Sequence, residues 1–276
     1  MSLFAAAPAE VLDVELLARQ PGGAALARVT ATPEGALLAT GTLVLVGPTD
    51  PCGECEVCRR GGAAVCAHAR PRDPIAWTAQ LSSRWLVALG DGLELPSPAA
   101  AAVAGDLAVA YTLYARTGLA PRDPVVVTGT TPITRFLVEI LRAKGLTPVV
   151  VTDHAELAAW AIGKAAHVAT DRDGVIAATH TLGLGARPLR VIATDAASLP
   201  LAAELAGPRA TLTVLSPAAD LPGSLIAREV TIIGVAGAHP DLVTEVAAMC
   251  AKGEIDLVGG TTADRSDPTR AIVIAR

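Results

Sequence analysis

Four cysteines lie close together in the segment PCGECEVCRRGGAAVC, and they are Cys52, Cys55, Cys58 and Cys66. Thiolates are preferred ligands of Zn²⁺, and four of them complete its tetrahedral coordination, so no position stays open for a substrate. The spacing therefore predicts one structural zinc ion per chain, bound by a loop at residues 52–66. Free or disulfide-bonded cysteines and an iron–sulfur cluster are the alternatives that this spacing leaves open.

A second segment that could bind a ligand begins at Gly129. The apolar run PVVVTG (124–129) predicts a buried strand, and residues 133–145 have the apolar spacing of a helix. In this context a fingerprint G-x-G-x-x-G lets backbone N–H groups at the helix N-terminus bind a diphosphate. Here the segment is Gly129-Thr130-Thr131-Pro132-Ile133-Thr134, so the first glycine is present and two threonines replace the others.

The two threonines change what this turn is expected to do. The second glycine of the fingerprint lets the backbone approach a diphosphate, and the third lets the helix pack closely on the strand. Thr131 should therefore project into the phosphate space, and Thr134 should displace the helix or force a compensating shift. A threonine hydroxyl can also donate to a phosphate. Gly129, Thr130, Thr131 and Ile133 therefore stay candidate cofactor-binding residues.

Asp153 ends the next strand along the chain, TPVVVTD (147–153). Its separation from Gly129 is close to the roughly 20 residues at which an acidic residue meets a ribose 2′-hydroxyl, which would favour NAD over NADP. The alternative is a solvated carboxylate without a ligand. The degenerate glycine pattern counts against NAD(H), and Asp153 counts in its favour.

The elements that must position these residues alternate between strands and helices after residue 124. The strand-like runs are PVVVTG (124–129), TPVVVTD (147–153), HVAT (167–170), LRVIATD (189–195), ATLTVLS (210–216) and EVTIIGV (229–235). Repeated strand–helix units predict an α/β fold with a doubly wound parallel sheet. Residues 1–98 predict an irregular, mostly β region, and residues 99–118 predict an alanine-rich helix. The last segment, TRAIVIAR, predicts a strand that returns to the N-terminal region.

The composition fits a globular protein, because 51% of the residues are hydrophobic and 18% are charged. Lys and Arg number 22 against 27 Asp and Glu, so the formal charge of −5 argues against nucleic acid as a partner. The sequence has no apolar run of about 18 residues, and its N-terminus lacks a basic residue before its apolar stretch. We therefore expect neither a membrane span nor a signal peptide, and we expect a cytoplasmic protein.

Three segments resemble the zinc-type medium-chain dehydrogenase/reductase (alcohol dehydrogenase) family over nearly the whole chain. They are GPTDPCGECEVCRRGGAAVC, LPSPAAAAVAGDLAVAYTLY and PVVVTGTTPITRFLVEILRAKGLTPVVVTD. The resemblance implies a reduced GroES-like β domain, residues 1–118 and 254–276, which carries the zinc lobe at 52–66. It also implies a Rossmann-like nucleotide-binding domain at 119–253 and dimerisation through its sheet. The tail REVTIIGVAGAHPDLVTEVAAMCAKGEIDL looks most like branches that oxidise alicyclic hydroxyacyl-CoA compounds.

Against this family, the chain is degenerate and shortened around the catalytic zinc. Thr32 stands where the family has a cysteine ligand, the Gly-His-Glu segment is missing, and Gly105 stands at the ligand position in the alanine-rich helix. Asp106 follows one residue later. A single carboxylate cannot hold a catalytic zinc, which takes three protein ligands. We therefore predict that this chain lacks a catalytic zinc.

Two functions follow as hypotheses. The first is a non-catalytic structural or regulatory subunit that forms a homodimer or a heteromer with an active homologous dehydrogenase. The second is a zinc-independent NAD(P)H-dependent oxidoreductase that acts on a small carbonyl, enoyl or acyl-CoA substrate. In that case Asp106, Thr130, Thr131 and Tyr111 would be candidate polar contacts. A third reading is a binding module whose widened cleft takes a small ligand such as an acyl-CoA.

Overall fold

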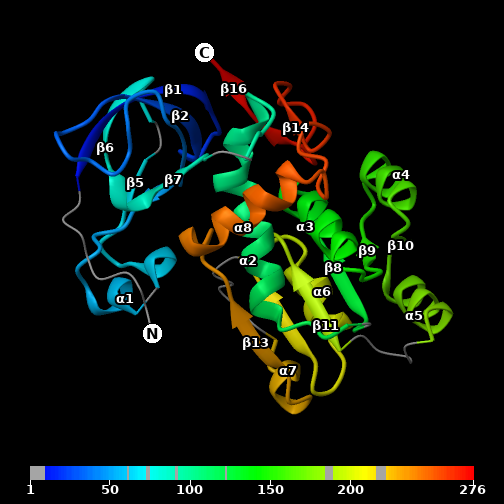
Figure 1. Ribbon diagram of the computed structural model, residues 1–276. Helices are drawn as coiled ribbons and strands as arrows, with labels where there is room; N and C mark the ends of the chain where they lie inside the picture. The colour runs from blue at the N-terminus through cyan, green and yellow to red at the C-terminus, as the bar shows by residue number, and fades with distance from the viewer. Residues whose placement is uncertain are drawn as a thin grey trace.

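The computed structural model describes residues 10–60, 62–72, 75–90, 93–121, 123–183, 189–215 and 222–276. Residues 1–9, which belong to the N-terminal stretch judged above for a signal peptide, lie outside these ranges. Figure 1 shows a curled antiparallel sheet from the N-terminal part of the chain beside a parallel sheet covered by helices. Within the described residues, no helix has both the length and the apolarity to cross a membrane.

The parallel sheet follows directly from the short, valine-rich runs of the sequence. Its strands are β8 (Val125–Thr128), β9 (Val149–Val151), β10 (His167–Ala169), β11 (Arg190–Ala193), β12 (Thr211–Val214) and β13 (Thr231–Gly234). The strands lie in the order β10-β9-β8-β11-β12-β13, and all neighbours are parallel. This is the doubly wound order 3-2-1-4-5-6, and it confirms the predicted Rossmann sheet. The order reverses between β8 and β11, where ligands of such sheets bind.

Helices cover both faces of this sheet. They are α2 (Ala108–Thr117), α3 (Pro132–Ala143), α4 (Ala155–Gly163), α5 (Arg172–Thr181), α6 (Leu199–Leu205), α7 (Ser224–Ala227) and α8 (Pro240–Ala251). Alternate residues of β8 point to opposite faces. Val125 and Val127 pack in one core with residues of α2, α3 and α8, and Val126 packs in another core with residues of α5 and α6. The first turn of α3 is therefore fixed beside the end of β8.

The alanine-rich segment 99–118 does not form the single helix predicted from its sequence. It consists of a 3-10 turn (Ala99–Ala102), a widened π turn (Val103–Leu107) and then α2. Gly105 leaves the helical conformation, with φ −109° and ψ −115°. A Cβ there would lie 1.9 Å from Gln20 Oε1 and 2.9 Å from Ala24 Cβ, so the β1–β2 turn occupies the space beside this residue. The close approach of that turn accompanies the break in the helix.

The antiparallel sheet is built mainly from the N-terminal part of the chain. Its strands are β1 (Val11–Arg19), β2 (Ala25–Ala31), β3 (Leu43–Val46), β6 (Thr78–Ser82), β7 (Leu86–Ala88) and β16 (Ile274–Ala275). The path is β16-β1-β2-β3-β7, and β6 also pairs with β1. Ala18 of β1 is the partner of Ala275 in β16, which confirms that the last segment returns to the N-terminal sheet.

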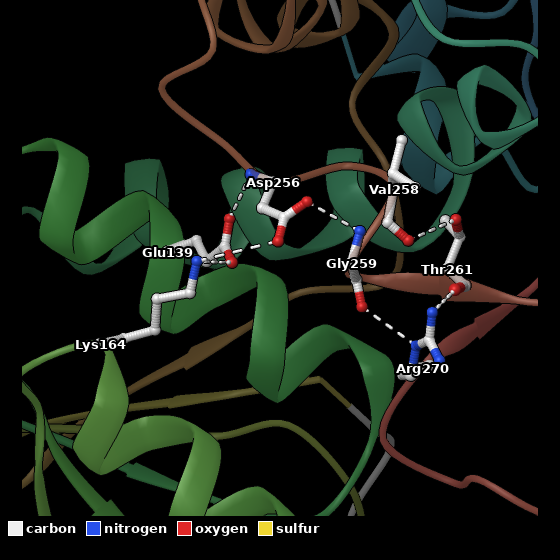
Figure 2. Close-up of polar contacts among 7 residues, drawn as sticks. All are labelled: Glu139, Lys164, Asp256, Val258, Gly259, Thr261 and Arg270. Carbon is white, nitrogen blue, oxygen red and sulfur yellow. Dashed lines mark hydrogen bonds and ion pairs between the residues drawn. The ribbon is translucent and has the colours of Figure 1, made fainter.

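The segment between α8 and β16 is held against the helices of the parallel sheet (Figure 2). Glu139 of α3 is 5% exposed, and its Oε2 accepts a hydrogen bond of 2.6 Å from the backbone N–H of Asp256. Lys164 Nζ lies 3.1 Å from Glu139 Oε1. Asp256 Oδ1 accepts from Gly259 N at 2.7 Å, and the carbonyl of Gly259 accepts from Arg270 Nε at 3.0 Å. Residues 256–270, which include β14 (Thr261–Thr262), are thereby tied to α3 before the chain continues through β15 (Ala271–Ile272) to β16.

Candidate functional site

The four cysteines meet in one cluster, with sulfur atoms that all lie within 4.8 Å of one another. Cys66 Sγ lies 3.6 Å from Cys52 Sγ and 3.9 Å from Cys55 Sγ, and the Cys52–Cys58 sulfur distance is 4.0 Å. A tetrahedron with metal–sulfur bonds of about 2.3 Å has edges of about 3.8 Å. The cluster therefore fits a zinc ion bound by four thiolates.

Local backbone structure prepares these sulfurs for a cation. Cys55 caps α1 (Glu56–Arg59), and its Sγ accepts a hydrogen bond of 3.4 Å from Cys58 N. Cys52 Sγ accepts from Cys55 N at 3.4 Å. Backbone N–H groups lower the pKa of the Cys52 thiol to about 6, whereas burial raises the pKa of the Cys58 thiol to about 12. Because zinc binds the thiolate form, loading the cluster should release a proton from Cys58.

The zinc lobe, residues 52–66, is anchored by a short ribbon and by side chains around it. The ribbon pairs β4 (Thr49–Asp50) with β5 (Arg70–Pro71). Trp85 Nε1 donates a hydrogen bond of 2.8 Å to the carbonyl of Pro51, next to the first cysteine. Arg72 is buried and donates to Asp50 Oδ1 at 3.1 Å and to the carbonyl of Gly47 at 3.0 Å. The lobe is thus connected to the antiparallel sheet through polar contacts at its base.

A basic residue from outside the cysteine segment, Arg84, lies against the lobe backbone at Gly53. Gly53 has a φ of +75°, and a Cβ there would lie 1.7 Å from Arg84 Nη1. Arg60, within the lobe, forms an exposed ion pair of 2.5 Å with Glu56. Arg84 lies some thirty positions downstream, outside the cysteine segment, so motif spacing gave no signal for it.

Next to Gly105, which the sequence resemblance places at a catalytic-ligand position, Asp106 forms a polar contact with Gln20 of the β1–β2 turn. Gln20 Nε2 donates to Asp106 Oδ2 at 2.9 Å, and Asp106 N donates to Gln20 Oε1 at 3.3 Å. Burial raises the pKa of the Asp106 carboxyl. Thr32 follows β2, and no hydrogen bond joins it to this pair in the described part of the chain. Among the described residues, the four cysteines are the one group of three or more side chains arranged to hold a metal.

The turn after β8 lies at the reversal point of the parallel sheet, where a dinucleotide would bind. Gly129 has a φ of +122°, a conformation that favours glycine. A Cβ at this position would lie 2.2 Å from Thr194 Oγ1 and 2.6 Å from Asp195 Oδ2. Side chains that follow β11 therefore already fill the space over this turn.

The backbone donors of the turn have partners within the chain. Thr130 N donates to Asp195 Oδ2 at 3.2 Å, and Thr131 N donates to Thr134 Oγ1 at 3.3 Å. These are the N–H groups that would face a diphosphate at the N-terminus of α3. A bound diphosphate would have to displace both contacts, so the residues present do not fit this cofactor group.

Thr134 is accommodated by a hydroxyl cluster rather than left to clash. Its side chain is fully buried, and its Oγ1 lies 2.6 Å from Thr194 Oγ1. Thr194 donates to the carbonyl of Thr128 at 3.0 Å, so Thr134 is the donor in the bond between the two hydroxyls. Thr131 Oγ1 also lies 3.4 Å from Thr194 Oγ1. Hydrogen bonds between α3 and the residue that follows β11 thus hold Thr134 in place.

The other candidate contacts are not gathered at this turn. Asp153 follows β9 and is exposed, and Ile133 packs against the core under α3. Tyr111 is 4% exposed, and its hydroxyl hydrogen-bonds Glu245 of α8, which also pairs with Lys144 at 3.5 Å. Its hydroxyl is therefore engaged between helices.

Comparison with known proteins found no matching family model and no matching curated protein. Solved structures do match. An alcohol dehydrogenase from Thermus sp. ATN1 superposes with a TM-score of 0.80 at 18% identity, over 93% of this chain and 86% of that one. Galactitol-1-phosphate dehydrogenase from Escherichia coli has a TM-score of 0.82 at 15% identity, over 98% and 94%. The chain has the alcohol dehydrogenase fold.

A third match, an alcohol dehydrogenase from E. coli CFT073 solved with NADH, has a TM-score of 0.80 at 15% identity, over 96% of this chain and 92% of that one. These matches cover nearly the whole chain, so they include both the antiparallel part and the parallel sheet. It agrees with the resemblance found in the sequence. At these identities the likeness concerns the fold, and the chemistry must be judged from the residues of this chain.

Proposed function

We propose that this chain is a non-catalytic structural or regulatory subunit derived from the zinc-type medium-chain dehydrogenases. One observation carries the proposal. The N–H groups of Thr130 and Thr131, which would bind a dinucleotide, donate instead to Asp195 and Thr134. Hydride transfer in this fold needs a nicotinamide cofactor, whose reactive ring the protein must position. A chain whose own side chains occupy the N–H groups of the cofactor-binding turn can keep the fold and still lack hydride transfer.

The metal-binding residues support the same conclusion. Cys52, Cys55, Cys58 and Cys66 would hold one zinc ion in a closed thiolate set, which stabilises the lobe and offers a substrate no open coordination position. Asp106, one residue after the Gly105 that the resemblance places at the third catalytic-ligand position, is hydrogen-bonded to Gln20. Zinc in this chain would therefore serve folding.

A subunit role requires a surface that binds another chain, and the edge of the parallel sheet offers one. Within the described residues, β13 pairs on one side only, with β12. Thr231 is exposed and Ile232 is 39% exposed on this strand. An edge strand presents unpaired N–H and C=O groups that can accept a further strand. The partner would be a second copy of this chain or an active homologous dehydrogenase.

Three measurements test the proposal. Calorimetric titration of the pure protein with NADH, NADPH, NAD and NADP should show no micromolar binding, with an active alcohol dehydrogenase as the positive control. Elemental analysis should give about one zinc per chain. Native mass spectrometry of protein purified from its source would identify the partner. Micromolar binding of any of the four dinucleotides would refute the non-catalytic role, and two zinc ions per chain would refute the loss of the catalytic site.

The alternative is a zinc-independent NAD(P)H-dependent oxidoreductase on a small carbonyl, enoyl or acyl-CoA substrate. The exposed position of Asp153 at the end of β9 favours it, since a ribose hydroxyl could reach this carboxylate. Oxidation of NADH on addition of an activated alkene or a quinone, abolished in Asp153→Ala, would support this function over the first.

A further inference from the structure

Asp195 follows β11 and lies beside the turn that ends β8. Its two carboxylate oxygens have different partners. Oδ2 accepts the hydrogen bond from Thr130 N at 3.2 Å, and Oδ1 accepts one of 2.8 Å from Ser198 N at the start of α6. The side chain is thereby held in one orientation, with one oxygen directed at the turn.

Asp195 Oδ2 accepts from an N–H group that a bound diphosphate would use. A Cβ on Gly129 would lie 2.6 Å from Asp195 Oδ2, so the carboxylate is in close contact with this backbone. In the fingerprint this first glycine permits the tight turn, and phosphate oxygens accept from the N–H groups at the helix N-terminus. In this chain one of these groups, the N–H of Thr130, donates to a carboxylate of the protein itself.

We propose that Asp195 is an internal anion that takes the place of the diphosphate and excludes nucleotides from this crevice. The inference rests on the proposed loss of dinucleotide binding and assigns that loss to a residue outside the fingerprint. The hydroxyls of Thr131 and Thr134 are neutral and can donate to a phosphate. The carboxylate of Asp195 repels a phosphate and also competes for its N–H donor. Asp195 should therefore oppose diphosphate binding more strongly than the hydroxyls of Thr131 and Thr134 do.

The test compares removal of the carboxylate with restoration of the glycines. The variants are Asp195→Asn, Asp195→Ala and the double variant Thr131→Gly/Thr134→Gly, each titrated calorimetrically with ADP and NADH. We expect both Asp195 variants to bind ADP at least about tenfold more tightly than the wild type, because a charge-assisted contact is removed and its donor is freed. The double variant, which retains Asp195, should stay at the wild-type level.

A matched control comes from a second aspartate that accepts a backbone hydrogen bond at the start of a helix. Asp171 Oδ1 accepts a hydrogen bond of 2.8 Å from Gly174 N at the start of α5, much as Asp195 does at α6. Asp171→Asn should leave ADP binding unchanged. Zinc content and circular dichroism show whether each variant is folded, and the isosteric Asp195→Asn preserves an acceptor for Ser198.

The outcomes separate this inference from the proposed function. Folded Asp195 variants with no gain in ADP affinity would overturn it, and so would a double variant that binds ADP while Asp195 is present. Micromolar binding of NADH to the wild type would end the proposed function. If Asp195→Ala then binds NADH more tightly than the wild type does, the inference that Asp195 opposes nucleotide binding holds even though the proposed function fails.

Discussion

The zinc lobe and the dinucleotide turn are both loops that present backbone N–H groups to a ligand, and they differ in what meets those groups. In the lobe, N–H groups donate to sulfurs of Cys52 and Cys55, and four sulfurs surround a space of the size of a metal ion. In the turn, N–H groups and hydroxyls donate to side chains of the protein itself. In a loop that binds a ligand, the polar groups surround a space that the ligand can fill. In a loop that functions without a ligand, the polar groups hydrogen-bond to one another.

The largest effect should come from breaking the lobe. Cys55→Ser removes a ligand and also the sulfur that accepts from Cys58 N. Since zinc binding contributes on the order of 10 kcal/mol in small four-ligand sites, the variant should lose its zinc and the order of the lobe. Zinc per chain and limited proteolysis within residues 52–66 measure this.

Cys250→Ser is the control for this variant, because Cys250 is buried in α8 and lies outside the cluster. It should keep about one zinc per chain. If Cys55→Ser also retained its zinc, the four-thiolate assignment would be wrong.

The second effect concerns the buried contact that ties the C-terminal segment to α3. Glu139→Ala removes the acceptor of Asp256 N and the partner of Lys164. Lys164 is partly exposed and can return to water, so the cost comes chiefly from the unpaired N–H and the lost packing. We expect a loss of about 2 kcal/mol in the free energy of unfolding, measured with urea.

Glu139→Gln keeps an oxygen that can accept from Asp256 N and removes only the charge, so it measures the contribution of the charge to stability. Burial raises the pKa of Glu139, so above the ordinary value of about 4.3 the folded chain holds this proton while the unfolded chain releases it. The stability of the wild type relative to Glu139→Gln should therefore be highest at low pH and fall as the pH rises through the raised pKa. Urea unfolding of both proteins from about pH 4 to about pH 8 tests the sign. A difference that grows with pH would contradict it.

Much of the fold could be predicted because its signals are local. Continuous valine-rich runs are typical of strands buried on both faces, and β8 and β9 form where those runs lie. The cysteine spacing likewise predicted the cluster. The alanine-rich segment misled the prediction, since its composition favours a helix while the β1–β2 turn, far away in sequence, reaches the break at Gly105.

The parts of the site that sequence reasoning missed depend on strand order. Asp195 is 65 positions from Thr130, and no local pattern connects them. Once the order places β11 beside β8, a carboxylate directly after β11 is expected near the fingerprint turn. Arg84 was missed for the same kind of reason, because it lies outside the cysteine segment and only the folded chain brings it to Gly53.

A smaller effect tests whether the turn is a self-contained polar cluster. Thr194→Val removes the acceptor of the buried Thr134 hydroxyl and should cost about 1–2 kcal/mol. The double variant Thr134→Val/Thr194→Val removes both hydroxyls, and it should cost less than the sum of the two single variants, because no buried hydroxyl is left without a partner. Urea unfolding of the three variants measures the coupling. Strict additivity would show that the two hydroxyls do not stabilise one another.

The smallest expected effect is a difference in zinc release between variants of two arginines, Arg60 and Arg84. Arg60 pairs with Glu56 at the surface, where such pairs contribute little, so Arg60→Ala should change stability by less than about 0.5 kcal/mol and leave zinc release unchanged. Arg84 lies against Gly53, where a guanidinium would offset part of the excess negative charge of four thiolates around one Zn²⁺. Arg84→Ala should therefore lose zinc to a chelator faster than Arg60→Ala, and Arg84→Lys should restore most of the difference because it keeps the charge. Equal release rates for all three would mean that the backbone N–H groups of the loop stabilise the thiolates without help from either arginine.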